Sequence, residues 1–221
     1  MSTAESMRDA AMSPDSYATS VLISNKSLNS LGSIFGRIVA VLLTPFVLLV
    51  SLFFIPLILL SSNESPIWRQ RRVGYRGLDI LVPKFSTMNV ADSGELCETW
   101  FGRIVRPIGL DEILQVFLIV KGDMQWFGPR PFLRKDLSEL YIASVLSYTK
   151  PGMFNSRSLA TGIGNRALQE GGVSIAEMIR HDRSDLEQWS FSYAARILLG
   201  TVAMVGKAGM KMVRSRADRP A

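Results

Sequence analysis

The sequence contains one cysteine, Cys97, and one histidine, His181. A single cysteine excludes a disulfide within the chain and a zinc site made of cysteines. A single histidine excludes a metal site made of several histidines. We therefore interpret both residues as structural. Any catalysis must rest on carboxylates, on arginine and lysine, and on an oxygen-ligated metal.

Acidic residues are fewer than basic ones: 19 Asp and Glu stand against 25 Lys and Arg, which gives a net charge of +6. Hydrophobic residues make up 48% of the chain, and the mean hydropathy is +0.20. An apolar, basic chain indicates contact with an anionic membrane surface, although nucleic acid would attract the same charge. The length of 221 residues predicts one medium domain with an extra element.

Charge is missing altogether from Ile38 to Leu60. A helix that spans a bilayer needs about 20 apolar residues, so this stretch is long enough, and a buried core helix is the less favoured alternative. Pro45, which follows Thr44, predicts a kink. Basic residues flank both ends, and the positive-inside tendency favours both flanks in the cytoplasm. A kinked helix that enters and leaves by the same face satisfies this, but these residues alone also allow a kinked spanning helix.

The composition divides the chain into three parts. Residues 1–31, rich in Ser, Ala and Asn, predict a flexible tail without a signal peptide. Residues 32–62 hold the membrane helix, and residues 63–221 form a cytosolic or interfacial domain. The expected fold class is α+β and membrane-associated, with amphipathic helices and a short β-hairpin or sheet after the membrane segment.

The cytosolic part begins with two strand patterns. "IWRQRRVG" and "LDILVPKFST" are joined by the turn-like "GYRG" and predict a hairpin, with Pro83 at an edge or a bulge. "ILQVFLIV" fits a strand or a helix by its periodicity. The acids before it and Lys121-Gly122 after it favour a helix.

Two further helices are expected toward the C-terminus. Residues 137–148 form one amphipathic pattern, and a second runs from about Ile175 to Met212. We expect the second to be broken near Trp189 or Gly200. Its mixture of aromatic and aliphatic residues beside basic ones fits either the membrane interface or a packed core helix.

Asp111 and Glu112 open the segment that we expect to be helical. Two anions in a first helical turn complement the helix dipole, typically for about 0.3–1 kcal/mol, and this ordinary role is one interpretation. An active site is the other. A carboxylate within reach of a phosphoanhydride can act as a nucleophile and form an acyl phosphate.

Arginines near this acidic pair favour the second interpretation. Arg103 and Arg106 precede the pair, and Arg130 lies between Pro129 and Pro131. Guanidinium groups beside a helix N-terminus form an anion site that fits phosphate. Two carboxylates would repel phosphate unless a cation intervenes, and Mg²⁺ is usually bound by carboxylates together with substrate phosphates. A stiff loop with a solvated arginine is the alternative for Arg130.

Several sequence elements, in their order and spacing, resemble one known family. They are "LLTP", "SPIWRQRRVG", "KFSTM", "RPIGLDEILQVFLIVKGDM", "GPRP", "KPG" and "WSF". Over roughly residues 33–200 the chain is similar to the bacterial sugar transferases of the monotopic phosphoglycosyl transferase superfamily, in their minimal form with one membrane segment. The Arg-x4-Asp-Glu element, followed by Lys-Gly-Asp-Met and Gly-Pro-Arg-Pro, is highly specific.

The resemblance implies a two-step reaction at the cytoplasmic face of the bacterial inner membrane. Asp111 would attack the β-phosphate of a UDP-sugar and release UMP, and the phosphosugar would then pass to polyprenol (undecaprenyl) phosphate. Glu112 would help to hold Mg²⁺, with Asp111 as a further ligand, and Arg106 would bind substrate phosphate. Such a reaction initiates the synthesis of a polysaccharide or glycoconjugate.

The resemblance also assigns residues outside the acidic pair. Thr44 and Pro45 would form the break of a re-entrant membrane helix-turn-helix. The residues expected at the substrate phosphates and the nucleotide, besides Arg106, are Arg72, Lys84, Pro129, Arg130 and Pro131. Expected partners are the UDP-sugar, polyprenol phosphate and membrane lipid, together with a second copy of the chain or downstream glycosyltransferases. Nucleic acid is not expected.

The chain also departs from the family pattern. Ser86 stands where the family usually has Arg, Gly109 where Ser or Thr precedes "LDE", and Gly36 where an acidic residue is common. Residues 153–170 differ most from the family. A catalytically weakened, membrane-bound partner in a polysaccharide assembly complex is therefore the alternative function. A basic membrane-surface or nucleic-acid-binding module would explain the charge, but not the Asp-Glu and Pro-Arg-Pro elements.

Overall fold

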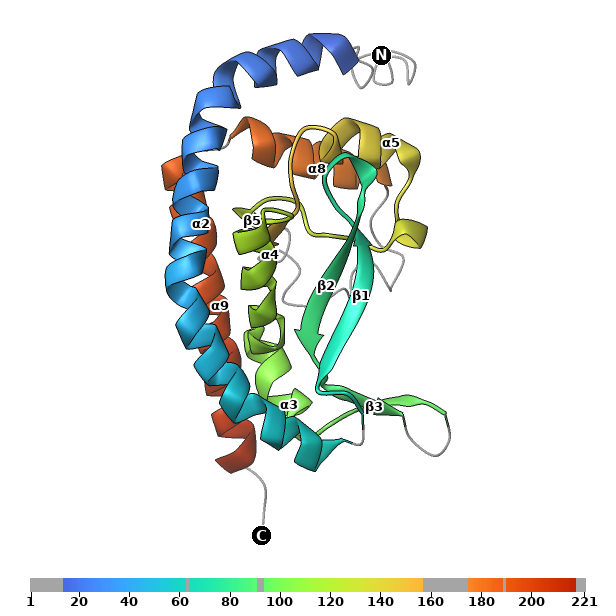
Figure 1. Ribbon diagram of the computed structural model, residues 1–221, viewed down its shortest axis with the longest axis vertical. Helices are drawn as coiled ribbons and strands as arrows, with labels where there is room; N and C mark the ends of the chain where they lie inside the picture. The colour runs from blue at the N-terminus through green and yellow to red at the C-terminus, as the bar shows by residue number, and fades with distance from the viewer. Residues whose placement is uncertain (1–13, 63, 91–93, 157–174, 189, 218–221) are drawn as a thin grey trace.

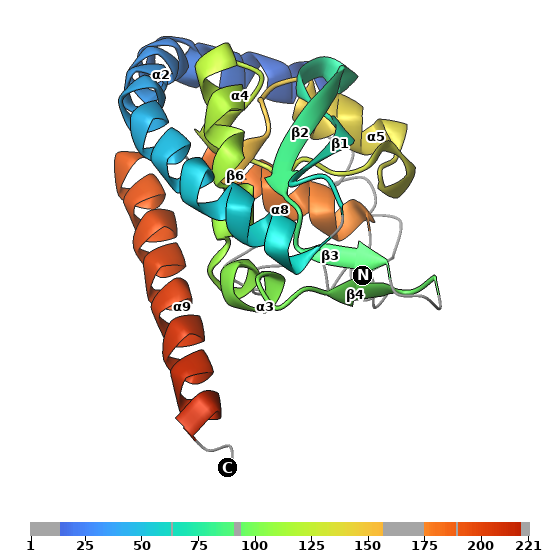
Figure 2. The ribbon, with the colours of Figure 1, turned by 60° about the horizontal axis from the view of Figure 1, so that its bottom comes forward.

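The structure is a computed structural model that describes residues 14–62, 64–90, 94–156, 175–188 and 190–217. Helix α2 (Pro14–Ser61) curves along one side of the molecule, and the smaller elements lie on its inner side (Figure 1). Helix α9 (Phe191–Ala217) extends away from the other elements toward the C-terminal end (Figure 2). This arrangement confirms the expected mixture of helices and strands.

Helix α2 is longer than the sequence predicts. It begins at Pro14, so residues 14–31, which we expected in a flexible tail, are helical instead. Proline suits the first position of a helix because its missing N–H needs no partner there. Residues 1–13 lie outside the described part of the chain.

The expected helix-turn-helix is one continuous helix in this structure. Pro45 and Pro56 both lie inside α2, and the Thr44 hydroxyl donates a hydrogen bond to the Ala40 carbonyl 3.0 Å away. Each proline removes one backbone hydrogen bond, which bends a helix while the remaining bonds hold it together. The outcome is a curved helix instead of two helices joined by a turn (Figure 1).

The apolar part of α2 is exposed. Ser33–Ser61 is long and apolar enough to cross a membrane by length and composition, and only 17% of its most apolar window is buried. The exposed large hydrophobic residues of this part are Ile34, Phe35, Ile38, Val41, Leu42, Leu43, Phe46, Leu48, Leu49, Leu52, Phe53, Leu59 and Leu60. A core helix of a soluble protein hides such a surface. Membrane association is therefore favoured over the core-helix alternative.

The predicted hairpin is confirmed. Strands β1 (Ile67–Val73) and β2 (Asp79–Phe85) pair antiparallel and form a two-stranded sheet. Both are edge strands, so Pro83 lies at an edge as expected. Successive side chains point to opposite faces of a strand, and this alternation places Arg72 and Lys84 on the same face of the hairpin.

The other helical elements are short. They are η1 (Tyr75–Gly77), α3 (Gly102–Val105), η2 (Arg106–Ile108), η3 (Leu110–Gln115), α4 (Val116–Lys121), η4 (Arg134–Asp136), α5 (Glu139–Tyr141), η5 (Ile142–Leu146) and α8 (Ile175–Glu187). The helix predicted for "ILQVFLIV" is confirmed as η3 followed by α4, and the helix at 137–148 as α5 followed by η5. The helix predicted from about Ile175 to Met212 is divided into α8 and α9. The division lies beside Trp189, which is outside the described residues. Gly200 lies inside α9, so the break expected there as the alternative is absent.

Two pairs of short strands were not predicted. Strands β3 (Met88–Val90) and β4 (Leu96–Glu98) pair antiparallel, whereas β5 (Gln125–Phe127) and β6 (Gly152–Phe154) pair parallel. A strand of three residues is too short to show a period of two in the sequence. The β5–β6 pair matters for the site because it brings the "GPRP" and "KPG" elements side by side.

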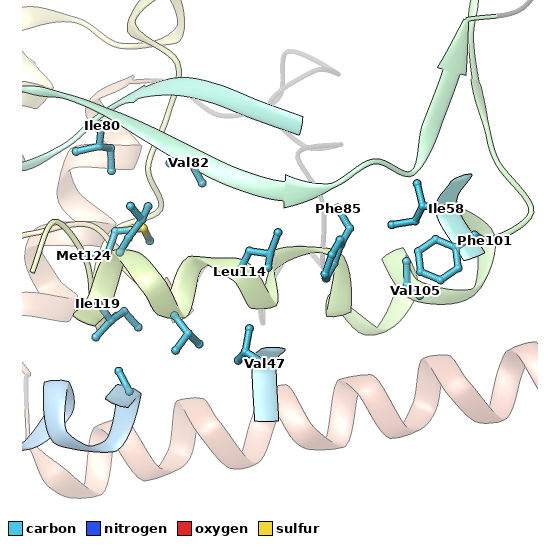
Figure 3. Packing of buried hydrophobic residues seen from close by; sticks show 13 residues of the cluster. Val47, Ile58, Ile80, Val82, Phe85, Phe101, Val105, Leu114, Ile119 and Met124 are labelled. Carbon is cyan, nitrogen blue, oxygen red and sulfur yellow. The ribbon is translucent and has the colours of Figure 1, made fainter. Parts of the chain in front are cut away.

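The core consists of two clusters of buried hydrophobic residues. The larger cluster joins α2, β2 and the η3–α4 segment through residues such as Val47, Val82 and Leu114 (Figure 3). The second cluster includes Phe132 and Tyr141 and lies between α5, η5 and α8. The first cluster fixes the η3 segment against β2, which sets the distance between the acidic pair and the basic hairpin.

Candidate active site

Asp111 and Glu112 lie in the short 3-10 helix η3, directly after Gly109. Gly109 has φ 70°, in the left-handed region, where a side chain would be strained. This conformation separates η2 from η3 and turns the chain into the acidic pair. The departure from the family's Ser or Thr therefore has a structural reason, because the backbone at this position favours glycine.

Glu112 is held by positive charges. Its Oε1 atom is 2.5 Å from the Lys84 ammonium and 2.9 Å from a guanidinium nitrogen of Arg130. Its Oε2 atom accepts a hydrogen bond of 3.1 Å from the Gln115 amide. Burial alone would raise the pKa of Glu112, but the charges of Arg130 and Lys84 outweigh burial and hold the pKa well below its usual range. Glu112 is therefore ionised and fixed in place.

Asp111 has the opposite environment. In the part of the chain that the structure describes, its carboxylate forms no ion pair or hydrogen bond with another residue's side chain. Burial and the neighbouring charge of Glu112 raise the pKa of Asp111 to about 6, although Lys84 and Arg106 act in the other direction. Two adjacent carboxylates with pKa values pushed apart are typical of sites in which each has its own task. Of the two carboxylates, Asp111 is therefore the one that no ion pair holds among the described residues.

Arg72 and Arg130 add a concentrated positive charge beside Glu112. Arg72 is buried and donates hydrogen bonds to the Pro131 carbonyl (2.5 Å) and to the Gln70 side chain (2.7 Å). Burial, and then the nearby charge of Arg130, lower the pKa of Arg72. The buried Nε atoms of both arginines have no hydrogen-bond partner among the described residues. Unsatisfied buried donors are costly, so these two N–H groups are suited to an incoming anion.

A small pocket joins these groups. It is lined by Arg72, Val82, Lys84, Glu112, Gln115, Arg130, Pro131, Gly152 and Met153. Gly152 donates a backbone hydrogen bond of 2.9 Å to the Pro129 carbonyl. A Cβ atom at Gly152 would lie 2.1 Å from the backbone nitrogen of Gly128, so the close approach of these two segments needs glycine.

Some pocket residues were not predicted. Gln115 follows Glu112 by three residues, and this spacing places two helical side chains on the same face, which was a usable signal. Gly152 belongs to the "KPG" element, but its position beside Pro129 depends on the parallel β5–β6 pair. Val82 and Met153 carried no signal that distinguished them from ordinary core residues.

Other predicted residues lie outside the pocket lining, and Asp111, next to Glu112 in η3, is one of them. Arg106 forms an ion pair with Glu98 at 3.4 Å, and its influence on the site is the effect of its charge on Asp111. Pro129 is buried and contributes its carbonyl to the β5–β6 contact. Thr44 and Pro45 lie in α2.

Two further departures from the family pattern are Ser86 and the run 153–170. Ser86 is buried, and its hydroxyl donates a hydrogen bond to the Ser65 carbonyl, so it ties β2 to the segment after α2. In the divergent run 153–170, residues 157–170 lie outside the described part of the chain.

The donor atoms of the acidic pair fit a hard divalent cation. Asp111 offers a carboxylate that pairs with no other residue's side chain among the described residues, and the Glu112 Oε2 atom accepts a hydrogen bond from the neutral Gln115 amide. Carboxylate oxygens of this kind are the protein ligands that Mg²⁺ prefers. The Oε1 atom of Glu112 already contacts two cationic groups and is the less suitable ligand.

Comparison with known proteins decides the family. The chain matches the bacterial sugar transferase family over residues 28–208. It belongs to this family. The sequence-based prediction of a sugar transferase is thereby confirmed.

Several characterised or named members are similar to this sugar transferase. The UDP-glucose:undecaprenyl-phosphate glucose-1-phosphate transferase of Caulobacter vibrioides is 29% identical, over an alignment that covers 70% of this chain and 64% of that protein. Exopolysaccharide production protein ExoY of Rhizobium meliloti is 27% identical, over 70% of this chain and 79% of ExoY. An Aeromonas hydrophila relative, named as an N-acetylgalactosaminephosphotransferase, is 34% identical over 34% of this chain and 20% of its own. The chain thus spans less than two thirds of the Caulobacter protein, and the names of its relatives include different sugars.

Proposed function

We propose that the protein transfers a phosphosugar from a UDP-sugar to polyprenol phosphate and thereby initiates the synthesis of a polysaccharide or glycoconjugate. The observation that carries the proposal is the contrast within one pair of carboxylates. Glu112 is ionised and held by Lys84 and Arg130, whereas Asp111 has no such partner and a pKa raised to about 6. The family relationship and the activities for which the relatives are named support the same reaction.

Asp111 is the nucleophile in this proposal. At neutral pH most of its carboxyl groups are ionised, because the pKa is about 6. A carboxylate oxygen attacks the β-phosphorus of the UDP-sugar, the bond from that phosphorus to the bridging oxygen breaks, and UMP leaves with the electron pair. The phosphosugar is then held on Asp111 as an acyl phosphate. An oxygen of polyprenol phosphate attacks the same phosphorus, forms polyprenyl diphosphosugar and restores the Asp111 carboxylate.

The basic residues bind and orient the diphosphate. Lys84 and Arg130 already contact Glu112 from the pocket, and Arg72 adds a third cation to which phosphate oxygens are attracted. Preorganised donors of this kind stabilise the charge that develops as UMP leaves. Arg72 also bonds to the Pro131 carbonyl and so fixes the loop that carries Arg130.

Mg²⁺ fits the same site, with Asp111 and the Oε2 atom of Glu112 as its protein ligands. When bound, it would neutralise phosphate charge and reduce the repulsion between the substrate and the acidic pair. The protein's own contribution is to keep Glu112 ionised and immobile, which holds one ligand in a constant position.

The polyprenol acceptor is a membrane lipid, so the proposal requires the site to lie at the membrane surface. We infer that α2 enters the inner membrane from the cytoplasmic side and returns to it, with the bend near Thr44 and Pro45 at the deepest point. The curvature of α2 and the basic residues on both flanks of its apolar part support this inference. A cysteine placed in the N-terminal tail and labelled from outside intact cells would contradict it.

The reaction is tested by UMP release. The purified protein is incubated with Mg²⁺, polyprenol phosphate and each of a panel of UDP-sugars, and Asp111→Asn serves as the inactive variant. Asp79→Asn is the matched control, because Asp79 is an exposed carboxylate in the hairpin, outside the pocket. We expect UMP from at least one donor with the wild type and the control, and none with Asp111→Asn. If no donor gives UMP above the Asp111→Asn background, the scaffold function replaces the proposal.

A further inference from the structure

A group of basic residues surrounds the start of the apolar part of α2, away from the acidic pair. This basic patch consists of Arg37 on α2, Lys121 at the end of α4 and Lys150 before β6, together with the single acid Asp123. Arg37 packs closely against the main chain: a Cβ atom at Gly122 would lie 2.3 Å from an Arg37 guanidinium nitrogen. A side chain at position 122 would therefore displace the Arg37 guanidinium group.

A second contact, between Trp126 on β5 and Gly36, holds α2 in place next to Arg37. The Trp126 indole donates a hydrogen bond of 2.8 Å to the Gly36 carbonyl, and a Cβ atom at Gly36 would lie 3.0 Å from the indole ring. The glycine that departs from the family's acidic residue thus lets Trp126 approach the helix. Because Gly36 precedes Arg37, this contact holds the arginine at a defined place in the fold.

The patch has more positive than negative charge. Lys121 pairs with Asp123 at 2.6 Å. Among the described residues, Arg37 and Lys150 form no ion pair. Burial, and then the charge of Arg37, lower the pKa of Lys150, and the two like charges repel one another. An anion between them would relieve this repulsion.

Apolar side chains continue directly from Arg37 along the helix. Ile34, Ile38 and Val41 are more than half exposed. Residues three and four apart share a helix face, so Ile34, Arg37, Ile38 and Val41 form one surface, with the charge beside the hydrocarbon groups. An anionic headgroup followed by acyl chains has the matching order of charge and hydrocarbon.

We propose that the basic patch binds the phosphodiester headgroup of an anionic glycerophospholipid, whose acyl chains lie along Ile38 and Val41. The bound lipid fixes the height of the domain at the membrane surface. The simpler role for Arg37 is that of a cation at the C-terminal end of α4, where it would interact with the last carbonyl groups. That role predicts a loss of stability that does not depend on lipid.

The test uses the full chain reconstituted in nanodiscs that contain equal amounts of phosphatidylglycerol and phosphatidylcholine with the same acyl chains. Native mass spectrometry then measures the ratio of the two lipids retained on the protein. We expect phosphatidylglycerol to be enriched on the wild type by about fivefold for each free cation. The double variant Arg37→Gln, Lys150→Gln is expected to retain the two lipids about equally.

Two controls separate the explanations. Lys135→Gln removes an exposed lysine on η4, outside the patch, and should leave the enrichment unchanged. Arg37→Lys keeps the charge and should retain most of the enrichment. Equal lipid ratios on the wild type and the double variant would overturn the proposal. If the double variant melts at a lower temperature in detergent but keeps the wild-type lipid ratio, Arg37 only stabilises the C-terminal end of α4. If added polyprenol phosphate displaces phosphatidylglycerol at an equal concentration, the patch serves the acceptor and the proposal fails.

Discussion

Replacing Asp111 by Asn is expected to abolish UMP release and, at the same time, to stabilise the fold at neutral pH. The pKa of this carboxyl rises from 3.8 to about 6 on folding because burial and Glu112 disfavour the ionised form. One pKa unit corresponds to about 1.36 kcal/mol, so the ionised Asp111 costs the folded state up to about 3 kcal/mol. Since Asp111 is only partly buried, solvent screening reduces this figure, and we expect about 1–2 kcal/mol.

The sign of the pH dependence makes the prediction specific. Below pH 3.8 the carboxyl is protonated in both states and its destabilising effect is absent; the effect grows as the pH rises and is complete above the folded pKa of about 6. Asp111→Asn should therefore melt about 2–8 °C above the wild type at pH 7.5, and the difference should shrink toward pH 4.5. Scanning fluorimetry in detergent across this range measures it, with Asp79→Asn as the control. A variant that melts at or below the wild-type temperature at pH 7.5 would refute the assigned environment of Asp111.

Three further predictions concern the same site. UMP release should fall about tenfold per pH unit below pH 6, because only the ionised Asp111 attacks, and a kcat/KM profile between pH 4.5 and 8 measures this. Arg130→Gln should raise the pKa of Glu112, lower the free energy of unfolding by about 1–3 kcal/mol in chemical denaturation and reduce kcat/KM by at least about 100-fold, since the buried carboxylate loses one of its two ion-pair partners and keeps Lys84 and the nearby charge of Arg72. Unchanged kcat/KM would argue against a role in phosphate binding. Gly109→Ala should cost about 1 kcal/mol in the same unfolding assay because the backbone has φ 70° there, and a neutral result would mean that this turn relaxes without strain.

Local patterns in the sequence predict the parts of the fold that depend on near neighbours. The β1–β2 hairpin follows from two strand patterns and a short turn, and the break beside Trp189 follows from the change in composition. The acidic pair with Arg130 could be selected because few other catalytic side chains exist in the chain. These inferences need no knowledge of which distant segments meet.

Contacts between segments that are distant in the sequence could not be predicted from the sequence alone. The pairing of Gln125 with Gly152 joins two three-residue strands that show no periodicity, yet it places "KPG" beside "GPRP". The bond from Arg72 to the Pro131 carbonyl gives this arginine a second, structural role that its sequence neighbours do not indicate. The prediction of a flexible tail was wrong for residues 14–31. Their composition, rich in Ser and Asn, is typical of a tail, but α2 begins at Pro14.

The central claim is that Asp111 carries the phosphosugar between donor and acceptor. It is tested most directly by mixing the protein with Mg²⁺ and the UDP-sugar selected in the donor panel, in the absence of polyprenol phosphate, and measuring UMP in the first turnover. A covalent intermediate predicts a burst of about one UMP per active site, together with a phosphosugar adduct on the peptide that contains Asp111. Release of UMP only after polyprenol phosphate is added, with no adduct, would contradict the account and indicate direct transfer from donor to acceptor.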